Sequence, residues 1–147
     1  MIAIGSDHAG FELKEAIKNH LTENNIEYID FGTHSADSCD YAVYAEKVAK
    51  SVVSGECEKG LLFCGTGVGI SIAANKVRGI RAACCSDVFS AEATRLHNDA
   101  NILCLGGRVV TKEKATELVD IFLKTEFTNE DRHIRRIAQI TELENNF

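Results

Sequence analysis

The sequence predicts a single three-layer α/β/α domain in which helices cover both faces of a parallel sheet. Segments with the patterns of strands and helices alternate along the whole chain of 147 residues, which is the order that a parallel sheet requires. The strand segments are continuous apolar runs, as expected of strands that are buried on both faces. The chain has no proline and no stretch with the composition of a linker. We therefore expect one domain over residues 1–147.

The elements follow one another in a regular order. Met1–Ile4 predicts the first strand, and a helix at about 9–24 follows with apolar residues at helical spacing. Ile26–Phe31 predicts the second strand, and the next helix begins after Asp40, a plausible N-cap, and ends at Gly55. The three remaining strands are predicted at Gly60–Cys64, Gly79–Cys85 and Ile102–Leu105. Each is followed by a predicted helix: a short one through Ala74, one from Asp87 to about Arg95, and one after Thr111. A further, last helix is predicted at about 130–144.

Composition and charge exclude several classes of protein. The formal net charge of −6 argues against nucleic acid or an acidic membrane as the main partner, because both are anionic. No apolar run approaches the roughly 20 residues of a membrane span, and the N-terminus lacks the pattern of a signal peptide, so we expect a cytoplasmic protein. None of the six cysteines has zinc-finger spacing, and a domain of this size does not need disulfides, so we expect reduced thiols.

The most informative stretch is the strand–loop–helix pattern Leu61–Ser71. Its strand ends in Cys64, and glycines then alternate with other residues at Gly65, Gly67 and Gly69. Glycines allow a sharp turn and a close approach of a ligand, and the N–H groups at a helix start attract anionic oxygens. A thiol in that position is biased toward thiolate. We interpret the stretch as a base or nucleophile beside an anion-binding loop, although a cysteine that only packs in the core would fit the strand as well.

A nucleotide-binding loop is the alternative for this stretch. The P-loop pattern fails, because no lysine follows a suitably spaced glycine. The dinucleotide pattern G-x-G-x-x-G nearly fits from Gly65, but Ile70 occupies the place of the last glycine. Asp87 lies about 20 residues further on, where that pattern has its ribose-binding acid. A dinucleotide-binding oxidoreductase domain is therefore a second hypothesis.

Further chemistry-bearing side chains follow other strands. Asp7 and His8 follow the first strand, and Arg108 follows the last. The carboxyl ends of parallel strands share one edge of the sheet, so these side chains are expected near Cys64. Asp7 suits a helix cap as well as a ligand contact, whereas His8 at a helix start can donate to an anion.

Other candidates lie on the predicted helices. His97 and Asn98 close a helix, where histidine either complements the helix dipole or transfers protons near neutral pH. Tyr41 fits a core aromatic residue or a ligand contact. Arg132 and Arg136 share one face of the last helix and form either a solvated surface or a phosphate clamp. On the opposite side of that helix we expect three residues to face the core: Ile134, Ile137 and Ala138.

Together these motifs resemble the ribose-5-phosphate isomerase B family, which also includes allose- and galactose-6-phosphate isomerases. The resemblance covers nearly the whole chain. It rests on seven pieces in the order and spacing of the family: Gly5–Phe11, Asp40-Tyr41, Cys64–Lys76, Gly79–Ala82, His97–Asn101, Gly106–Val109, and Arg132-His133 with Arg136.

The resemblance implies a Rossmann-like sheet of five parallel strands and a homodimer or a dimer of dimers with active sites between two subunits. It implies a sugar phosphate as the ligand, and neither a metal nor an organic cofactor. A small domain without a second lobe has little with which to enclose such a ligand, which agrees with a shared site. The implied reaction interconverts D-ribose 5-phosphate and D-ribulose 5-phosphate through an enediolate.

The resemblance also implies a role for each candidate residue. Cys64 moves the proton between the two carbons, and His97 opens the sugar ring with Thr66 and Asp7 nearby. Preorganised donors must stabilise the enediolate, and the loop supplies N–H groups from Gly65, Gly67, Val68 and Gly69. The remaining substrate contacts are His8, Arg108, Arg132 and Arg136 for the phosphate, Asn98 for a hydroxyl, and Tyr41. We expect the neighbouring subunit to supply His97, Asn98 and Arg108.

The resemblance leaves open whether the substrate is a five-carbon or a six-carbon sugar phosphate. One branch of the family lacks a cysteine at the position of Cys64 and has a glutamate where this chain has Ile70, so this chain falls in the cysteine-using branch. An isomerase of allose or galactose 6-phosphate is the alternative, and the loop Thr33–Cys39 could decide the sugar length. A sugar-phosphate-binding subunit without activity is a third hypothesis, against which the presence of Cys64, Thr66 and His97 counts.

Overall fold

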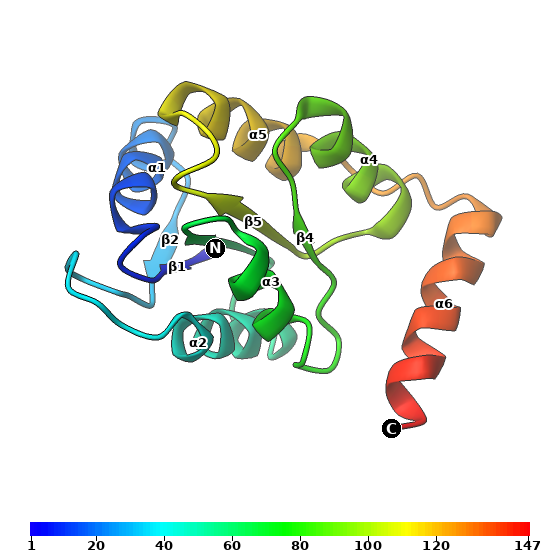
Figure 1. Cartoon of the computed structure of the whole chain (residues 1–147). Coiled ribbons are helices and arrows are strands. Elements are labelled where there is room, and N and C mark those ends of the chain that lie inside the picture. The colour runs from blue at the N-terminus through cyan, green and yellow to red at the C-terminus, as the bar shows by residue number, and fades with distance from the viewer.

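The computed structural model describes residues 1–147 as five strands and six helices (Figure 1). The strands are β1 (Ile2–Ser6), β2 (Tyr28–Asp30), β3 (Lys59–Cys64), β4 (Ala82–Cys84) and β5 (Ile102–Gly106). The helices are α1 (Phe11–Glu23), α2 (Tyr41–Val53), α3 (Val68–Ala74), α4 (Val88–Asn98), α5 (Lys112–Lys124) and α6 (Asp131–Asn145). No helix is both long enough and apolar enough to cross a membrane.

All five strands are parallel and form one sheet in the order β2-β1-β3-β5-β4. Helices α2 and α3 cover one face, and α1, α4 and α5 cover the other (Figure 1). Alternation along β3 supplies both cores: Leu61 and Phe63 pack under α1, α4 and α5, whereas Leu62 and Cys64 pack under α2 and α3. The predicted three-layer α/β/α fold with a five-stranded parallel sheet is therefore confirmed.

The strand order creates a switch point between β1 and β3. The chain leaves β1 toward β2 on one side and reaches β3 on the other, so the connections after these two strands diverge at the carboxyl edge of the sheet. Such a divergence leaves a crevice that side chains at the strand ends can line. Ser6 at the end of β1 pairs with Phe63 of β3, and Cys64 pairs with Gly106 of β5.

Several predicted boundaries differ from the structure, and two of them differ by three residues. Strand β4 is shorter than predicted, because the turn before it includes Gly79 at φ +90°. The side chain of Asn75 also forms hydrogen bonds with both the N–H and the carbonyl oxygen of Ala82. Helix α4 runs three residues past Arg95 and ends where Asp99 adopts a left-handed conformation with φ +45°. This conformation is a common helix C-terminus, and asparagine and aspartate tolerate it better than most residues.

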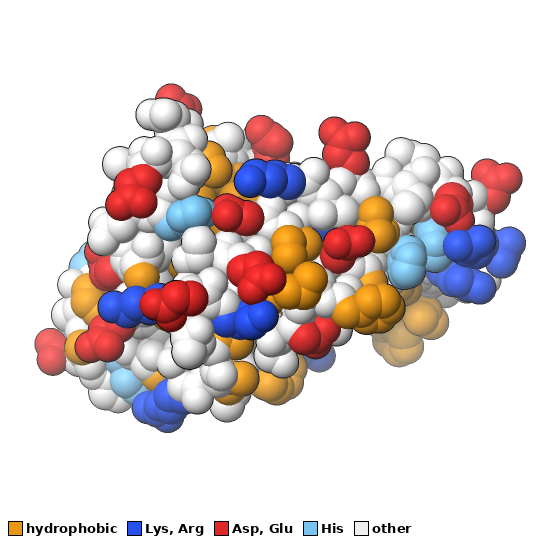
Figure 2. Space-filling view, turned by 90° about the horizontal axis from the view of Figure 1, so that it is seen from above, with side chains coloured by type: hydrophobic (Ala, Val, Ile, Leu, Met, Phe, Trp, Pro, Cys, Tyr) orange, Lys and Arg blue, Asp and Glu red, His pale blue; other side chains and the backbone are white.

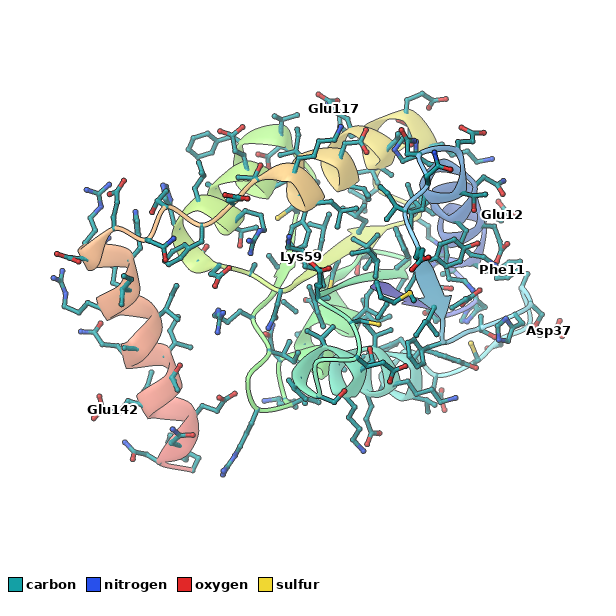
Figure 3. The ribbon with its side chains drawn as sticks, turned by 180° about the vertical axis from the view of Figure 1, so that it is seen from behind. Phe11, Glu12, Asp37, Lys59, Glu117 and Glu142 are labelled. Carbon is teal, nitrogen blue, oxygen red and sulfur yellow. The ribbon has the colours of Figure 1, made fainter.

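Helix α6 stands apart from the rest of the molecule (Figures 1 and 3). The prediction that its apolar side faces the core is wrong, since Ile134 is 46% exposed and Ala138 is also exposed, whereas His133 is buried. Side chains extend from the helix on both sides, and Glu142 lies on the side away from the body (Figure 3). A groove of about 830 Å³ separates the body from the apolar side of the helix, which carries Ile140 and Leu143.

Candidate active site

A hollow of about 400 Å³ lies at the carboxyl ends of β1 and β3. Its walls come from the turn after β1, the loop before α2, the glycine loop after β3 and the turn after β5. The lining residues are Asp7, His8, Ala9, Cys39, Asp40, Tyr41, Cys64, Gly65, Thr66, Gly69 and Arg108. The structure thus brings together eight of the residues that the sequence singled out.

Cys64 forms the floor of this hollow with only 4% of its surface exposed. The loop after β3 turns back over the thiol, because Gly67 adopts φ +82°, a conformation that favours glycine. The N–H group of Gly67 donates to Sγ of Cys64 at 3.1 Å. The N–H groups of Gly69 and Ile70 have no hydrogen-bond partner in the chain. One amide can therefore stabilise a thiolate, while that of Gly69, which lines the hollow, remains for a substrate oxygen.

Close packing holds two further side chains against the loop. A Cβ atom on Gly69 would lie 2.9 Å from Cζ of Tyr41, so the tyrosine ring rests on the backbone at the start of α3. A Cβ atom on Gly65 would lie 3.4 Å from Nη1 of Arg108, which places the guanidinium group beside the loop. Glycine at these positions thus leaves room for an aromatic wall and a cation next to Cys64.

Asp7 and His8 hold the opposite wall. Oδ1 of the buried Asp7 accepts a hydrogen bond from the N–H of Gly10 at 3.0 Å, so Asp7 stabilises the turn that starts α1 while it also lines the hollow. The N–H of Cys39 donates to Nδ1 of His8 at 3.2 Å. Since Nδ1 is then an acceptor, a neutral His8 carries its proton on Nε2 and can donate with it.

A buried ion pair anchors the loop that contains Cys39. Lys14 is fully buried on α1, and its Nζ donates to the carbonyl oxygen of Thr33 at 2.6 Å and to Oδ1 of Asp30 at 2.7 Å. Burial raises the pKa of Asp30, but hydrogen bonds from Lys14 and Lys18 outweigh burial and hold that pKa below its usual value. The carboxylate therefore stays charged at neutral pH and fixes the lysine that holds the loop.

The other predicted residues lie at the opposite edge of the sheet. Helix α4 begins beyond the carboxyl end of β4 and carries the chain back to the start of β5, so His97 and Asn98 near its end lie at the amino edge. The neighbouring turn confirms this position, since the N–H of Gly60 at the start of β3 donates to the carbonyl oxygen of Asn101. Neither His97 nor Asn98 lines the hollow around Cys64.

A basic group surrounds His97 at the start of α6. The rings of His97 and His133 stack with their centroids 4.4 Å apart and their planes at 17°. Arg132 and Arg136 lie exposed on the same part of α6, and Arg132 forms an ion pair with Glu130 at 2.8 Å. Figure 2 shows histidine and basic side chains gathered at this projecting end of the molecule.

The predicted site residues therefore fall into two groups within one chain. The carboxyl-edge group contains the Cys64 loop, with Gly67 and Val68, and the residues of the hollow. The amino-edge group contains His97, Asn98, Arg132 and Arg136. Arg108 belongs to the carboxyl-edge group of its own chain, whereas we expected the neighbouring subunit to supply it.

The other cysteines near the carboxyl edge are poor candidates for a base. All six cysteines are free thiols, as predicted. Burial raises the pKa of Cys85 to about 11 and the pKa of Cys104 well above its ordinary value. Burial also raises the pKa of Cys84, whose Sγ lies 3.7 Å from the carbonyl oxygen of Thr66. These thiols stay protonated at neutral pH, so they are unsuited to take a proton from a substrate.

The nucleotide-binding alternative is not supported by the position of Asp87. Its Oδ1 accepts the N–H of Ser90 at 2.8 Å and its Oδ2 accepts the hydroxyl of the same serine, so the carboxylate caps α4. Asp87 also follows β4, which β5 separates from β3. The acid of the dinucleotide pattern therefore does not lie beside the Gly65 loop.

The sequence model of a family described as Ribose/Galactose Isomerase matches residues 2–140. The chain belongs to this family. It is 50% identical over 143 residues to ribose-5-phosphate isomerase B of Escherichia coli, covering 97% of this chain and 95% of that protein. A putative sugar phosphate isomerase of Bacillus subtilis is 51% identical over 144 residues, with 97% of this chain and 96% of that protein covered.

Solved structures of relatives have the same fold. Ribose-5-phosphate isomerase B of Clostridium thermocellum superposes with a TM-score of 0.97 at 52% identity and covers 99% of this chain and 97% of that one. Ribose-5-phosphate isomerase B of Mycoplasma genitalium, solved with bound ribulose-5-phosphate, superposes with a TM-score of 0.94 at 40% identity, with 99% of this chain and 97% of that one covered. The likeness therefore extends over the whole domain, including α6.

Sequence reasoning missed several residues that support the site. Lys14 fits an exposed helix position by type, and only its burial beside Asp30 shows its role. Cys39 contributes a backbone N–H, and since every residue except proline has one, the residue type does not predict this contact. His133 was part of the quoted motif, but its stacking on His97 joins residues from two helices 36 positions apart, which periodicity does not reveal.

Proposed function

We propose that this chain is an aldose–ketose isomerase that interconverts D-ribose 5-phosphate and D-ribulose 5-phosphate through an enediolate. The family and the names of its relatives supply the substrate class. The observation that carries the proposal is the buried thiol of Cys64 beneath a loop whose Gly69 and Ile70 amides lack partners. Proton transfer next to a carbonyl needs this combination of a base and preorganised donors.

The proposed chemistry begins on the open form of the sugar. Cys64, as thiolate, takes the proton from C2 of the aldose, and the electron pair of the broken C–H bond forms the C1–C2 double bond while O1 becomes negative. Loop amides stabilise that oxygen. A proton passes from O2 to O1, and the thiol returns its proton to C1, which yields the ketose and regenerates the thiolate. We assign ring opening before this step to His97, with Thr66 and Asp7 nearby.

The phosphate and hydroxyl contacts come from cationic and polar side chains. His8 can donate from Nε2, and Arg108 lies beside the Gly65 loop. Arg132 and Arg136 add two guanidinium groups whose geometry suits phosphate. We assign Asn98 to a sugar hydroxyl, and Tyr41 to the wall of the site.

We propose further that the working site combines two chains. His97 and Cys64 lie at opposite edges of one sheet, so one chain does not bring them to the same substrate. A two-fold dimer would place the amino-edge group of each chain against the carboxyl-edge group of the other. It would also cover apolar residues that α6 exposes, such as Leu143 at 62% exposure. We therefore propose a homodimer, or a dimer of dimers, with two shared sites.

The first test measures conversion of ribose 5-phosphate to ribulose 5-phosphate by the purified protein. Cys64→Ala should abolish conversion, whereas Cys57→Ala, which removes another buried thiol outside the hollow, should leave it nearly unchanged. Equal activity of wild type and Cys64→Ala would remove Cys64 as the base. Turnover of allose 6-phosphate but not of ribose 5-phosphate would reassign the sugar to six carbons. A lack of activity on both sugar phosphates would favour the hypothesis of a sugar-phosphate-binding subunit without activity.

The second test asks whether the site is shared. Cys64→Ala and His97→Asn are inactive alone if each removes one catalytic group. Co-expressed in equal amounts, they form mixed dimers in which one of two sites is intact, so about a quarter of wild-type activity returns. If both residues act within one chain, every site stays defective and no activity returns. Sedimentation analysis of the same samples reports the oligomeric state.

The free thiols support a proposal on the location of the protein. All six cysteines are unpaired, and free thiols persist in a reducing compartment. We therefore propose that the enzyme works in the cytoplasm.

A further inference from the structure

We propose that His133 is a positioning residue that holds the imidazole of His97 in the orientation needed for ring opening. The inference rests on the proposed function, because it assigns a supporting role to the neighbour of a proposed catalytic group. His133 itself has no position in the hollow around Cys64 and acts through the face of the His97 ring.

The contact between the two rings is close and nearly parallel. Their centroids lie 4.4 Å apart and their planes differ by 17°, which is within the range of stacked aromatic pairs. His133 is only 5% exposed, whereas His97 is half-buried. A buried ring therefore supports one face of a ring whose other parts remain accessible.

His133 is not held there by hydrogen bonding. Its buried Nε2 has no hydrogen-bond partner in the chain, and the nearest carboxylate oxygen, Oε2 of Glu130, is 3.9 Å away. A buried polar atom without a partner costs stability, so an apolar side chain would serve the fold better at this position. The stack on His97 is the contact that accounts for an aromatic ring here.

The charge state of His133 suits this role. Burial lowers the pKa of His133, and neighbouring positive charge lowers it further, so the ring is neutral at neutral pH. Four titratable or charged groups face it: His97 from α4, Arg132 and Arg136 from its own helix, and Glu130, which acts in the opposite direction. A neutral ring allows His97 to accept a proton without a second positive charge against its face.

A buried arginine makes the frame of the stack rigid. Nε of Arg95 donates to the carbonyl oxygen of Thr125 at 3.0 Å, in the segment that leads to α6. Its Nη1 donates to Oδ1 of Asp99 at 2.8 Å and to the carbonyl oxygen of Ala100 at 2.7 Å, just beyond α4. The end of α4 and the segment that carries His133 are therefore tied together two residues from His97.

The experiment separates ring opening from proton transfer. Ribulose 5-phosphate stays open because its 5-hydroxyl group is phosphorylated, so exchange of its C1 proton with D2O needs the base but no ring opening. Conversion of ribose 5-phosphate needs both. We would measure both rates by proton NMR for wild type, His133→Ala, His133→Phe and Arg135→Ala. Arg135 is exposed on the same helix, so its variant is a matched control.

We expect His133→Ala to slow conversion of ribose 5-phosphate by about 10- to 100-fold, the cost of misplacing a catalytic group, with C1 exchange close to wild type. His133→Phe keeps a planar ring and should restore most of the conversion, and Arg135→Ala should match wild type. Equal slowing of both rates in both His133 variants, or no slowing in either, would overturn the proposal. Wild-type protein without activity on ribose 5-phosphate would refute the proposed function, and this inference with it.

Discussion

The glycine at position 67 offers a sharp test of the active-site geometry. Gly67 has φ +82° and Gly55 has φ +84°, so alanine meets the same backbone strain at both positions. A Cβ atom at Gly55 would have no atom within 4 Å, whereas at Gly67 it would lie 3.0 Å from the carbonyl carbon of Leu105 and 3.0 Å from Sγ of Cys84. The pair therefore separates backbone strain from crowding.

The expected free energies of unfolding follow from these two contributions. A left-handed conformation costs an L-residue about 1–2 kcal/mol, and a less flexible unfolded chain returns about 0.4–1 kcal/mol of it. Gly55→Ala should therefore cost about 1 kcal/mol. Gly67→Ala also crowds the backbone of β5, and overpacking adds about 1–3 kcal/mol. Urea unfolding at one protein concentration measures both values.

Activity should separate the two variants more strongly than stability does. The crowding at Gly67 displaces the N–H that donates to Sγ of Cys64, and a hydrogen bond to a charged group contributes about 1.5–3 kcal/mol, or about 10- to 100-fold in kcat. Gly55→Ala should keep the wild-type kcat on ribose 5-phosphate. Equal stability losses in the two variants would refute the crowding argument. An unchanged kcat in a folded Gly67→Ala protein would refute the role of the amide.

Three further predictions concern charges. Lys14→Met leaves Asp30 without its buried partner and should lower the unfolding free energy measured in urea titrations by about 3 kcal/mol. Lys50→Met removes a lysine from an exposed ion pair and should cause no measurable loss. Equal losses in the two variants would contradict the buried-pair argument. Arg136→Ala should raise KM about tenfold with kcat little changed, while Arg135→Ala should leave KM unchanged. An unchanged KM in both variants would show that Arg136 is a solvated surface residue and does not bind phosphate. The folded-state pKa of Asp30 is lowered, so the stabilising effect of its charge is complete above about pH 3.9 and is lost as pH falls through the folded pKa. The difference in unfolding free energy between wild type and Asp30→Asn should therefore shrink below about pH 4. A difference that does not change with pH would show that the charge of Asp30 does not contribute to stability.

The carboxyl-edge group of candidate residues could be predicted from topology alone. Cys64 ends a strand, Asp7 and Arg108 each follow one, and parallel pairing gathers strand ends at one edge. The structure places all three around one hollow. What could not be predicted was which of their atoms are satisfied within the chain, such as the Sγ that accepts the Gly67 amide, because hydrogen-bond geometry depends on backbone angles that residue types do not fix.

The amino-edge group of candidate residues was harder to place for a different reason. Periodicity assigned α6 an apolar side correctly, but it did not specify what that side contacts, and Ile134 lies exposed instead of in the core. A hydrophobic stripe shows that a helix needs a partner, and the same stripe fits its own domain or another chain. The stack of His97 on His133 depends on the same placement of α6, so the sequence could not predict it either.

The sequence by itself determined the three-layer fold and the family, because apolar periodicity and the order of motifs are local properties of the chain. Only the tertiary structure decided that the candidate residues form two groups at opposite edges of the sheet, that Lys14 is buried, and that the ring of His133 stacks on the ring of His97. Each of these depends on contacts between residues far apart in the chain. Such contacts are selected by the packing of whole elements, since no short segment determines its partner before the others are in place.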